Sequence, residues 1–467
     1  MTSKCTMMFL LMLTMQLDVG VSLMPASSAV DAAKSAARAQ AEEQAAQVTT
    51  VNASEAAPDP NIIVIPLDKQ YVPVTKNNKT VMYKTAHFGK IYVGSPPQEF
   101  RVIFDTGSGH FFIPSTDCPA NTCKKHRGYD RQSSLTAIDL DHDGNVADPE
   151  KQRDKVEIEF GTGEVAGEFV WDVTCLQDHR GEQNFTDSRD CTMVRVITAT
   201  SMSEEPFQAF GFDGVVGLGL SDLAVHEDFS FFGQVAKQHR LSQARFGVFL
   251  SMDDEVPSEI SFGGHDVRRV AHEPSWVELE NPEYGYWQVT LVKVTVGGEP
   301  FALCDGYCTA IVDTGTSLLG VPKQELTNFH WLLARRVIDE PAELDCRNFP
   351  GPEIVFHFED GFNISVGPED YSRPAALKIK DSNKNETQVI CRSSLLPVAM
   401  PGEEETGRTW ILGEPVLKKY YTTYDWANQR VGFSLAVQPP KTDSKRHIIH
   451  GESTAGSKVP EPSVVEI

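Results

Sequence analysis

The feature that most constrains this chain is a seven-residue segment that occurs twice. The first copy, VIFDTGS, stands at residues 102–108, and the second, AIVDTGT, stands at residues 310–316. Roughly 100 residues after each copy come two apolar residues and a glycine, at 215–217 and 411–413. Matching elements at similar separations are typical of a duplicated structural unit. We therefore expect the 467 residues to form two related lobes.

The composition favours an all-β fold for both lobes. The chain contains 34 glycines and 28 prolines, which suits many short strands joined by turns. Apolar stretches at 62–65 and 88–94 alternate as strands do, and we expect folded structure to begin near Ile62. With a hydrophobic fraction of 40%, a large core can form.

The two ends of the chain differ from its middle. Lys4 and the apolar run at 7–13 are typical of a secretory signal peptide, and the run is too short to span a bilayer. Residues 30–60 are rich in Ala, Gln and Glu, and the chain beyond Ala436 is rich in Pro, Ser and charge. We predict a signal peptide at 1–23, a leader and candidate propeptide at 24–80, an N-terminal lobe at 81–270, a C-terminal lobe at 271–438 and a flexible polar tail at 439–467.

Cysteine usage agrees with export. Cys5 leaves with the signal peptide and eight cysteines remain, which can pair completely. Spacing favours two small loops, Cys118–Cys123 and Cys304–Cys308, and leaves Cys175–Cys191 and Cys346–Cys391, although spacing alone does not fix the connectivity. A zinc site is the rival interpretation, but companion ligands at metal spacing are missing. Five N-x-[ST] triplets, at Asn52, Asn78, Asn184, Asn363 and Asn385, are compatible with a secreted glycoprotein.

The formal charge of −23 argues against nucleic acid as a partner, because phosphate binding needs a basic surface. Excess carboxylates repel one another at neutral pH, and mild acid relieves this repulsion. We therefore expect the protein to work best in acid.

Each repeat places an aspartate, Asp105 or Asp313, where a buried strand turns toward a surface. A single Asp-Thr-Gly is a weak signal, because such turns are often structural. If the two lobes face each other, however, the two carboxylates meet and cannot both ionise easily. One then serves as a base and the other as an acid, and such a pair can activate water without a covalent intermediate.

With these motifs, the stretch from about Gly89 to Ala436 resembles the pepsin-like aspartic proteases. Similar stretches also stand at 212–219, 262–264, 285–288 and 410–413. The resemblance implies an all-β, bilobal pepsin-like fold with two related six-stranded-type β-barrel lobes and a substrate cleft between them. It implies an aspartic endopeptidase in which Asp105 and Asp313 are catalytic, without a cofactor. It also implies three of the four disulfides, with Cys175–Cys191 as an extra one.

The resemblance assigns supporting roles around the two aspartates. Thr106 and Thr314 would each bond to the opposite loop, and Ser108 and Thr316 would hold the outer carboxylate oxygens. Gly107 and Gly315 leave room beside the carboxylates. A glycine-containing flap at 159–167 would close over a bound peptide. The candidate flap residues are Phe160, Gly161, Thr162 and Gly163, and Phe112 is the aromatic residue that would face them. The family usually has Tyr at the position of Phe160 and Trp at the position of Phe112.

A second motif stands just before the flap. Residues 139–150 match the calcium-loop pattern, with Asp139, Asp141, Asp143, Asn145 and Glu150 as candidate ligands. Pro149 and a strand-like stretch at 156–160 do not fit a helix-loop-helix hand. The alternative is an acidic, solvated insertion.

The expected partner is a peptide or protein substrate, the expected state is a monomer, and we expect no transmembrane segment. The secretory route leads outside the cell or to an acidic, lysosome-like or vacuole-like compartment. Lys69, with Lys76, Lys79 and Lys84 as rivals, could mask the two carboxylates before activation. The alternative functions are a non-catalytic peptide-binding module and a calcium-dependent protein on a protease scaffold.

Overall fold

The computed structural model describes residue 57 and residues 59–439, except 77–78, 161–162, 305, 339, 342, 360, 382–385 and 401–406. The predicted signal peptide, most of the leader and nearly all of the polar tail lie outside this part of the chain. Within it, strands dominate and helices are short, which confirms the all-β prediction. No helix of the described part is both long and apolar enough to cross a membrane.

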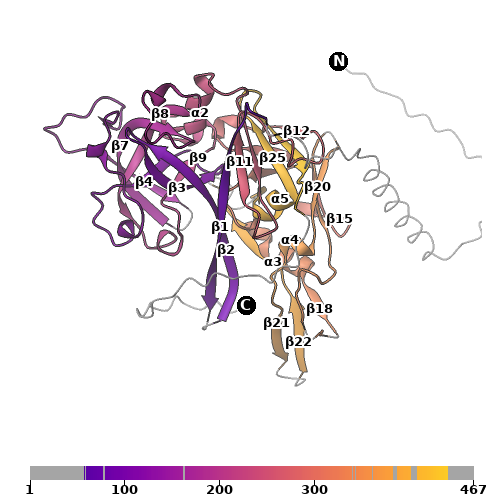
Figure 1. The fold of residues 1–467 in the computed structure, drawn as a ribbon. Helices are drawn as coiled ribbons and strands as arrows, with labels where there is room; N and C mark the ends of the chain where they lie inside the picture. Colours follow the sequence, from indigo (N-terminus) through magenta and orange to yellow (C-terminus); the bar gives the residue numbers. More distant parts are fainter. Residues whose placement is uncertain are drawn as a thin grey trace, which may run out of the picture. The chain divides into compact units, whose positions relative to one another are not determined.

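The largest sheet in the described residues has the strand order β12-β26-β25-β10-β11-β1-β2-β3-β9-β4-β8-β7-β5, and β6 pairs with β7 (Figure 1). Its strands are β1 Ile63–Lys76, β2 Lys79–Val93, β3 Gln98–Asp105, β4 Phe111–Pro114, β5 Ile138–Leu140, β6 Lys155–Phe160, β7 Gly163–Cys175, β8 Cys191–Met202, β9 Gly214–Gly217, β10 Arg245–Phe249, β11 Ser258–Phe262, β12 Ser275–Glu278, β25 Tyr420–Asp425 and β26 Arg430–Leu435. The sheet therefore contains strands from both halves of the sequence.

Three smaller sheets belong to the second half, with the orders β13-β16-β24-β17-β23, β15-β14-β19-β20 and β18-β22-β21. Their strands are β13 Gln288–Leu291, β14 Lys293–Val296, β15 Glu299–Pro300, β16 Cys308–Val312, β17 Leu319–Pro322, β18 Arg335–Val337, β19 Ile354–His357, β20 Asn363–Val366, β21 Leu377–Asp381, β22 Glu386–Cys391, β23 Leu395–Val398 and β24 Thr409–Leu412. The helices are α2 Phe231–Lys237, α3 Leu326–Leu333, α4 Pro368–Tyr371 and α5 Glu414–Lys419.

The internal repeat of the sequence is also a repeat of topology. In the first half, β3 runs parallel to β9, β9 is antiparallel to β4, and β4 is parallel to β8. In the second half, β16 runs parallel to β24, β24 is antiparallel to β17, and β17 is parallel to β23. The segment 215–217 lies in β9. The segment 411–413 consists of the last two residues of β24 and the glycine that follows it. In each half, the Asp-Thr-Gly turn therefore follows the first strand of the same arrangement. These strands are β3, β9 and β4 in the first half and β16, β24 and β17 in the second.

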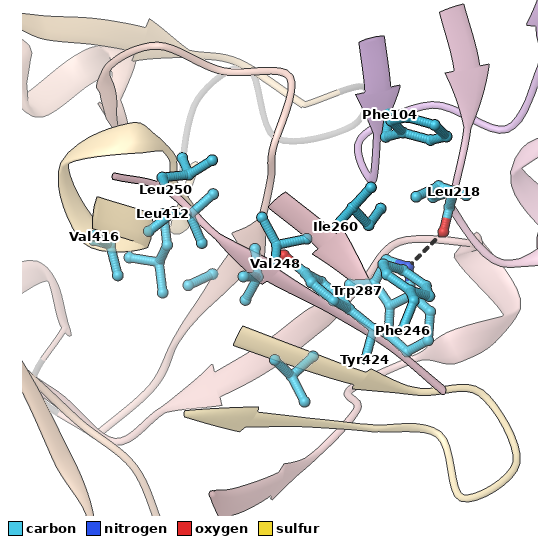
Figure 2. Close-up of a cluster of buried hydrophobic side chains, with 14 of the residues drawn as sticks. Phe104, Leu218, Phe246, Val248, Leu250, Ile260, Trp287, Leu412, Val416 and Tyr424 are labelled. Atoms are coloured by element: carbon cyan, nitrogen blue, oxygen red, sulfur yellow. Dashed lines mark hydrogen bonds between the residues drawn. The ribbon is translucent and has the colours of Figure 1, made fainter. Parts of the chain in front are cut away.

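The largest hydrophobic cluster of the described residues spans the two halves. Figure 2 shows Leu218 of the first half beside Trp287 of the second, and Phe104 and Tyr424 belong to the same cluster. Trp287 is fully buried, and its indole N–H donates to the backbone oxygen of Leu218 at 2.8 Å. Burying an indole and pairing its polar N–H stabilises a core more than burial alone. This packing fixes the strands that carry the two aspartates.

Among the described residues there are four disulfides: the two small loops that the spacing favoured, Cys118–Cys123 and Cys304–Cys308, and the two remaining pairs, Cys175–Cys191 and Cys346–Cys391. Cys175 and Cys191 also face each other at the end of the β7–β8 ladder. That disulfide therefore closes a loop whose ends the sheet already holds together.

Candidate active site

The two aspartates lie at matching ends of matching strands. Asp105 is the last residue of β3, whose preceding three residues, at 102–104, are buried, and Asp313 directly follows the buried strand β16. Their exposed fractions are 5% and 8%. Buried strands therefore bring both carboxyl groups into a water-poor region between the halves.

Two threonines connect the halves beside the aspartates. The backbone N–H of Thr106 donates to Thr314 Oγ1 at 3.0 Å, and the N–H of Thr314 donates to Thr106 Oγ1 at 3.0 Å. The hydroxyl of Thr106 donates to Val312 O at 2.8 Å, and that of Thr314 donates to Phe104 O at 2.6 Å. Because each threonine satisfies polar groups of the opposite half, these hydrogen bonds set the distance between the two loops.

The glycine of each motif packs against the carboxylate of the other. A Cβ atom on Gly107 would lie 2.7 Å from Asp313 Oδ1, and one on Gly315 would lie 2.3 Å from Asp105 Oδ1. Real Cβ atoms are not found this close to other heavy atoms. Glycine is therefore required at both positions, and the two carboxyl groups are brought together across the junction.

The hydrogen bonds to the two carboxylates are not symmetric. Asp105 Oδ1 accepts from Gly107 N at 2.9 Å, and Asp313 Oδ1 accepts from Gly315 N at 2.8 Å. The Thr316 hydroxyl donates to Asp313 Oδ2 at 2.6 Å. The Ser108 hydroxyl acts to lower the pKa of Asp105, but it makes no hydrogen bond within the described residues. Asp313 is therefore the more firmly held carboxylate.

The electrostatics of Asp105 follow from this geometry. Burial, and then the charge of Asp313, raise the pKa of Asp105 to about 7. Burial also raises the pKa of the Tyr286 and Tyr424 hydroxyls, and both aspartates add to this effect. The two tyrosines therefore lie near the pair, although only the stretch 285–288 signalled this in the sequence.

The predicted flap is a hairpin. Strands β6 and β7 pair with Phe160 opposite Gly163, and the tip residues Gly161 and Thr162 lie outside the described residues. Gly163 packs against the loop at 205–207, where a Cβ atom would meet Glu205 O at 2.7 Å. Phe112 is 1% exposed and packs edge-on against Phe207, with ring centres 5.8 Å apart. Any effect of Phe112 on the site therefore comes from its packing against Phe207.

The predicted calcium ligands do not come together. Asp139 is engaged by Arg131 at 2.8 Å and by Arg153 at 2.9 Å. Asp143 accepts from the amide of Asn145, and Asp141 N donates to Asn145 O in a turn that closes the loop. Among the described residues, Asp139, Asp141, Asp143, Asn145 and Glu150 form no ligand cluster. Two arginines have taken the place that a cation would need at Asp139.

Lys69 does not lie between the two aspartates. Its ammonium group donates to Ser251 O and to Asp254 Oδ1, both at 3.0 Å. Strand β1, which carries Lys69, pairs with β2 and β11 inside the main sheet. The lysine is therefore part of the folded body, and its position gives no support to the masking role.

Comparison with known proteins agrees with this geometry. The family model described as "Eukaryotic aspartyl protease" matches residues 86–436. The chain is 30% identical to Cathepsin E-A of Xenopus laevis over 357 residues, which cover 76% of this chain and 80% of that protein. It is 30% identical to Pepsin II-2/3 of Oryctolagus cuniculus and to Chymosin of Bos taurus, in each case over 75% of this chain and 81% of the relative. The chain belongs to the eukaryotic aspartyl protease family.

Proposed function

We propose that this protein is an aspartic endopeptidase that hydrolyses internal peptide bonds with water activated between Asp105 and Asp313. The observation that carries the proposal is the meeting of two buried carboxyl groups across the junction of the halves. Membership of the aspartyl protease family supports the same reaction class.

The asymmetry of the pair suggests a role for each member. Asp105, whose pKa is raised to about 7, carries the proton in the free enzyme below that pH. Asp313 accepts from Gly315 N–H and Thr316 O–H, and both hydrogen bonds stabilise its anion. Two aspartates that share one proton are an established property of aspartic proteases.

The reaction then needs only proton transfers. The Asp313 carboxylate removes a proton from water, whose oxygen attacks the peptide carbonyl carbon. The Asp105 hydroxyl hydrogen-bonds to the carbonyl oxygen and gives up its proton as a gem-diol forms. The proton that Asp313 holds then passes to the departing amine. The Asp105 carboxylate takes a proton from one hydroxyl of the gem-diol as the carbonyl re-forms and the C–N bond breaks, which restores the starting state of the pair. No atom of the enzyme becomes bonded to the substrate.

We propose an acidic working range for this reaction. Below about pH 7 Asp105 holds the shared proton, and above it both carboxyl groups are charged and the acid is lost. The net charge of −23 adds general repulsion at neutral pH. Rates should therefore fall as pH rises through neutrality.

The remaining assignments complete the proposal. The cleft between the proposed lobes, 81–270 and 271–438, takes an extended peptide, preferring bulky apolar residues beside the cleaved bond. The flap at 160–163 closes over it. We propose a monomer that enters the secretory pathway through the signal peptide at 1–23, with export or an acidic vesicle as its destination.

The proposal is tested by incubating an acid-denatured protein substrate with the purified chain at pH 3 to 7 and locating the cleavage sites by mass spectrometry. We expect internal cuts that a statine-type transition-state analogue blocks. Asp105→Asn and Asp313→Asn should each lower kcat at least about 10³-fold, whereas Asp222→Asn, at an exposed carboxylate, should not. Cleavage that survives Asp105→Asn unchanged would refute the mechanism.

A further inference from the structure

A buried group of charged side chains lies behind the Asp313 loop. His87 in β2 and Glu414 at the start of α5 are both buried, and His87 Nε2 lies 3.5 Å from Glu414 Oε1. The ammonium group of Lys418, one helical turn further along α5, lies 2.5 Å from the same oxygen. The reaction proposed above uses none of these three residues.

The cluster contacts the loop that carries Asp313. The backbone N–H of Glu414 donates to Thr316 O at 2.9 Å, and the Thr316 hydroxyl holds Asp313 Oδ2. A cavity of about 20 Å³ lies between the cluster and the loop, lined by His87, Glu414 and residues 314–317. Beside it, the Ser317 hydroxyl donates to Thr85 O at 2.8 Å, so β2 also supports the loop directly. A change at His87 can therefore reach Asp313 through a short chain of contacts.

The polar groups of the cluster are incompletely satisfied. Within the described residues, neither imidazole nitrogen of His87 forms a hydrogen bond. Glu414 Oε1 lies next to His87 and Lys418 but makes no hydrogen bond within the described residues. Buried polar groups of this kind are costly and need a reason. A protonated imidazole carries an N–H on both nitrogens, so Nε2 donates to Glu414 whatever the tautomer of the neutral ring, and the positive charge strengthens that contact.

The charges that face His87 set where it titrates. Burial lowers the pKa of His87, Glu414 opposes this effect, and Lys418 and Lys69 lower it further. Lys69 faces the ring from the opposite position on β1 and is itself paired with Asp254. Although burial alone would raise the pKa of Glu414, Lys418 and His87 lower it to about 2, so Glu414 stays ionised in mild acid. Of the three residues, His87 has the ordinary pKa nearest to mild acid, and burial with the two lysines lowers it from there.

We propose that His87 is a positioning residue: once protonated, it binds Glu414 tightly and so holds the Thr316–Asp313 segment in its active arrangement. This inference rests on the proposed aspartic peptidase reaction. It adds a second acid-dependent step, outside the catalytic pair, that acts on the carboxylate proposed as the base. His87 touches neither substrate nor the reacting atoms.

The test compares kcat and KM across pH 3 to 7 for the wild-type chain, His87→Gln and His272→Gln, an exposed control. Glutamine keeps a polar side chain but cannot become charged. We expect His87→Gln to lower kcat at pH 4 by roughly 3- to 10-fold, with KM within about twofold, and to flatten the rise of kcat in acid. His272→Gln should follow the wild type. A kcat–pH profile of His87→Gln that coincides with the wild type would overturn the inference, whereas an inactive wild type would instead refute the proposed function.

A second variant keeps the test decisive if His87→Gln folds poorly. Lys418→Met removes a cation that disfavours the protonated imidazole. The His87 ring, followed by NMR in the full chain, should then titrate at a higher pH, and the acid rise of kcat should move with it. A His87 pKa that moves while the kcat profile stays in place would show that the histidine is only structural.

Discussion

Replacing Asp105 by Asn should abolish activity and, at neutral pH, make the protein more stable. The carboxyl group is 5% exposed and lies against Asp313, so its pKa in the folded chain is raised to about 7 from an ordinary value of 3.8. Between those two pH values the folded state binds more protons than the unfolded state. Below about pH 4, ionisation of Asp105 therefore does not change the free energy of unfolding. As the pH rises from 4 to 7, ionisation of Asp105 lowers this free energy progressively. Asparagine carries no charge and has no such loss.

The magnitude follows from the two pKa values. Each pH unit between them corresponds to about 1.4 kcal/mol, which gives an upper limit of roughly 4 kcal/mol at pH 7. Because Asp313 shares the proton, we expect about 2 to 4 kcal/mol at pH 7, about 1 to 2 at pH 5 and close to zero at pH 3.5. At about 2 °C per kcal/mol, Asp105→Asn should unfold several degrees later than the wild type at pH 7.

The assay is thermal unfolding of both proteins at pH 3.5, 5 and 7, followed by calorimetry or near-UV circular dichroism. Asp222→Asn removes one exposed negative charge and controls for the general relief of repulsion. The gain for Asp105→Asn must exceed that of the control and must grow with pH. A gain that is equal at all three pH values, or a loss at pH 7, would refute the view that the two carboxyl groups repel each other in the folded chain.

Three further outcomes follow from the site. Gly107→Ala would place a Cβ atom 2.7 Å from Asp313 Oδ1 and should reduce kcat at least about 100-fold. Gly211→Ala is the control, because its Cβ would lie 3.3 Å from the flexible end of the Gln70 side chain, and it should not reduce kcat. Equal activities of the two variants would contradict the close contact at Gly107. Thr314→Val leaves Thr106 N without its acceptor and should lower the free energy of unfolding by about 2 to 4 kcal/mol in a denaturant titration, and a cost below about 0.5 kcal/mol would disprove a supporting role. Millimolar Ca²⁺ or a chelator should move the unfolding temperature by less than about 1 °C, because Asp139 is already paired with Arg131 and Arg153. A calcium-dependent rise of several degrees would show that the loop at 139–150 binds calcium.

The sequence was most informative where local pattern and tertiary structure depend on the same residues. The repeated Asp-Thr-Gly follows an apolar strand in both halves, so the strand, the turn and the carboxylate can be read together. The repeat also predicts two related units, and the order of β3, β9 and β4 matches that of β16, β24 and β17. The glycine of each motif is explained by a contact that only the duplicated arrangement supplies.

The sequence was least informative where a side chain's partner is distant along the chain. The calcium pattern was a local match, and nothing local indicates that Arg131 and Arg153 neutralise Asp139. His87 and Glu414 lie in opposite halves, and only the packing of β2 against the Asp313 loop brings them together. The unequal hydroxyls Ser108 and Thr316 likewise depend on the exact path of each loop rather than on residue type.

The sheet that joins the two halves limits when the chain can fold completely during its synthesis. Strand β25, near the end of the chain, pairs with β10 of the first half, with Arg245 opposite Asp425 and an ion pair at 2.7 Å between them. The sheet that joins the two halves is therefore complete only after β25 and β26 have been synthesised, close to the end of the chain. A product truncated before Asp313 would also lack one of the two aspartates. We therefore expect the proposed reaction to begin only when synthesis is nearly complete.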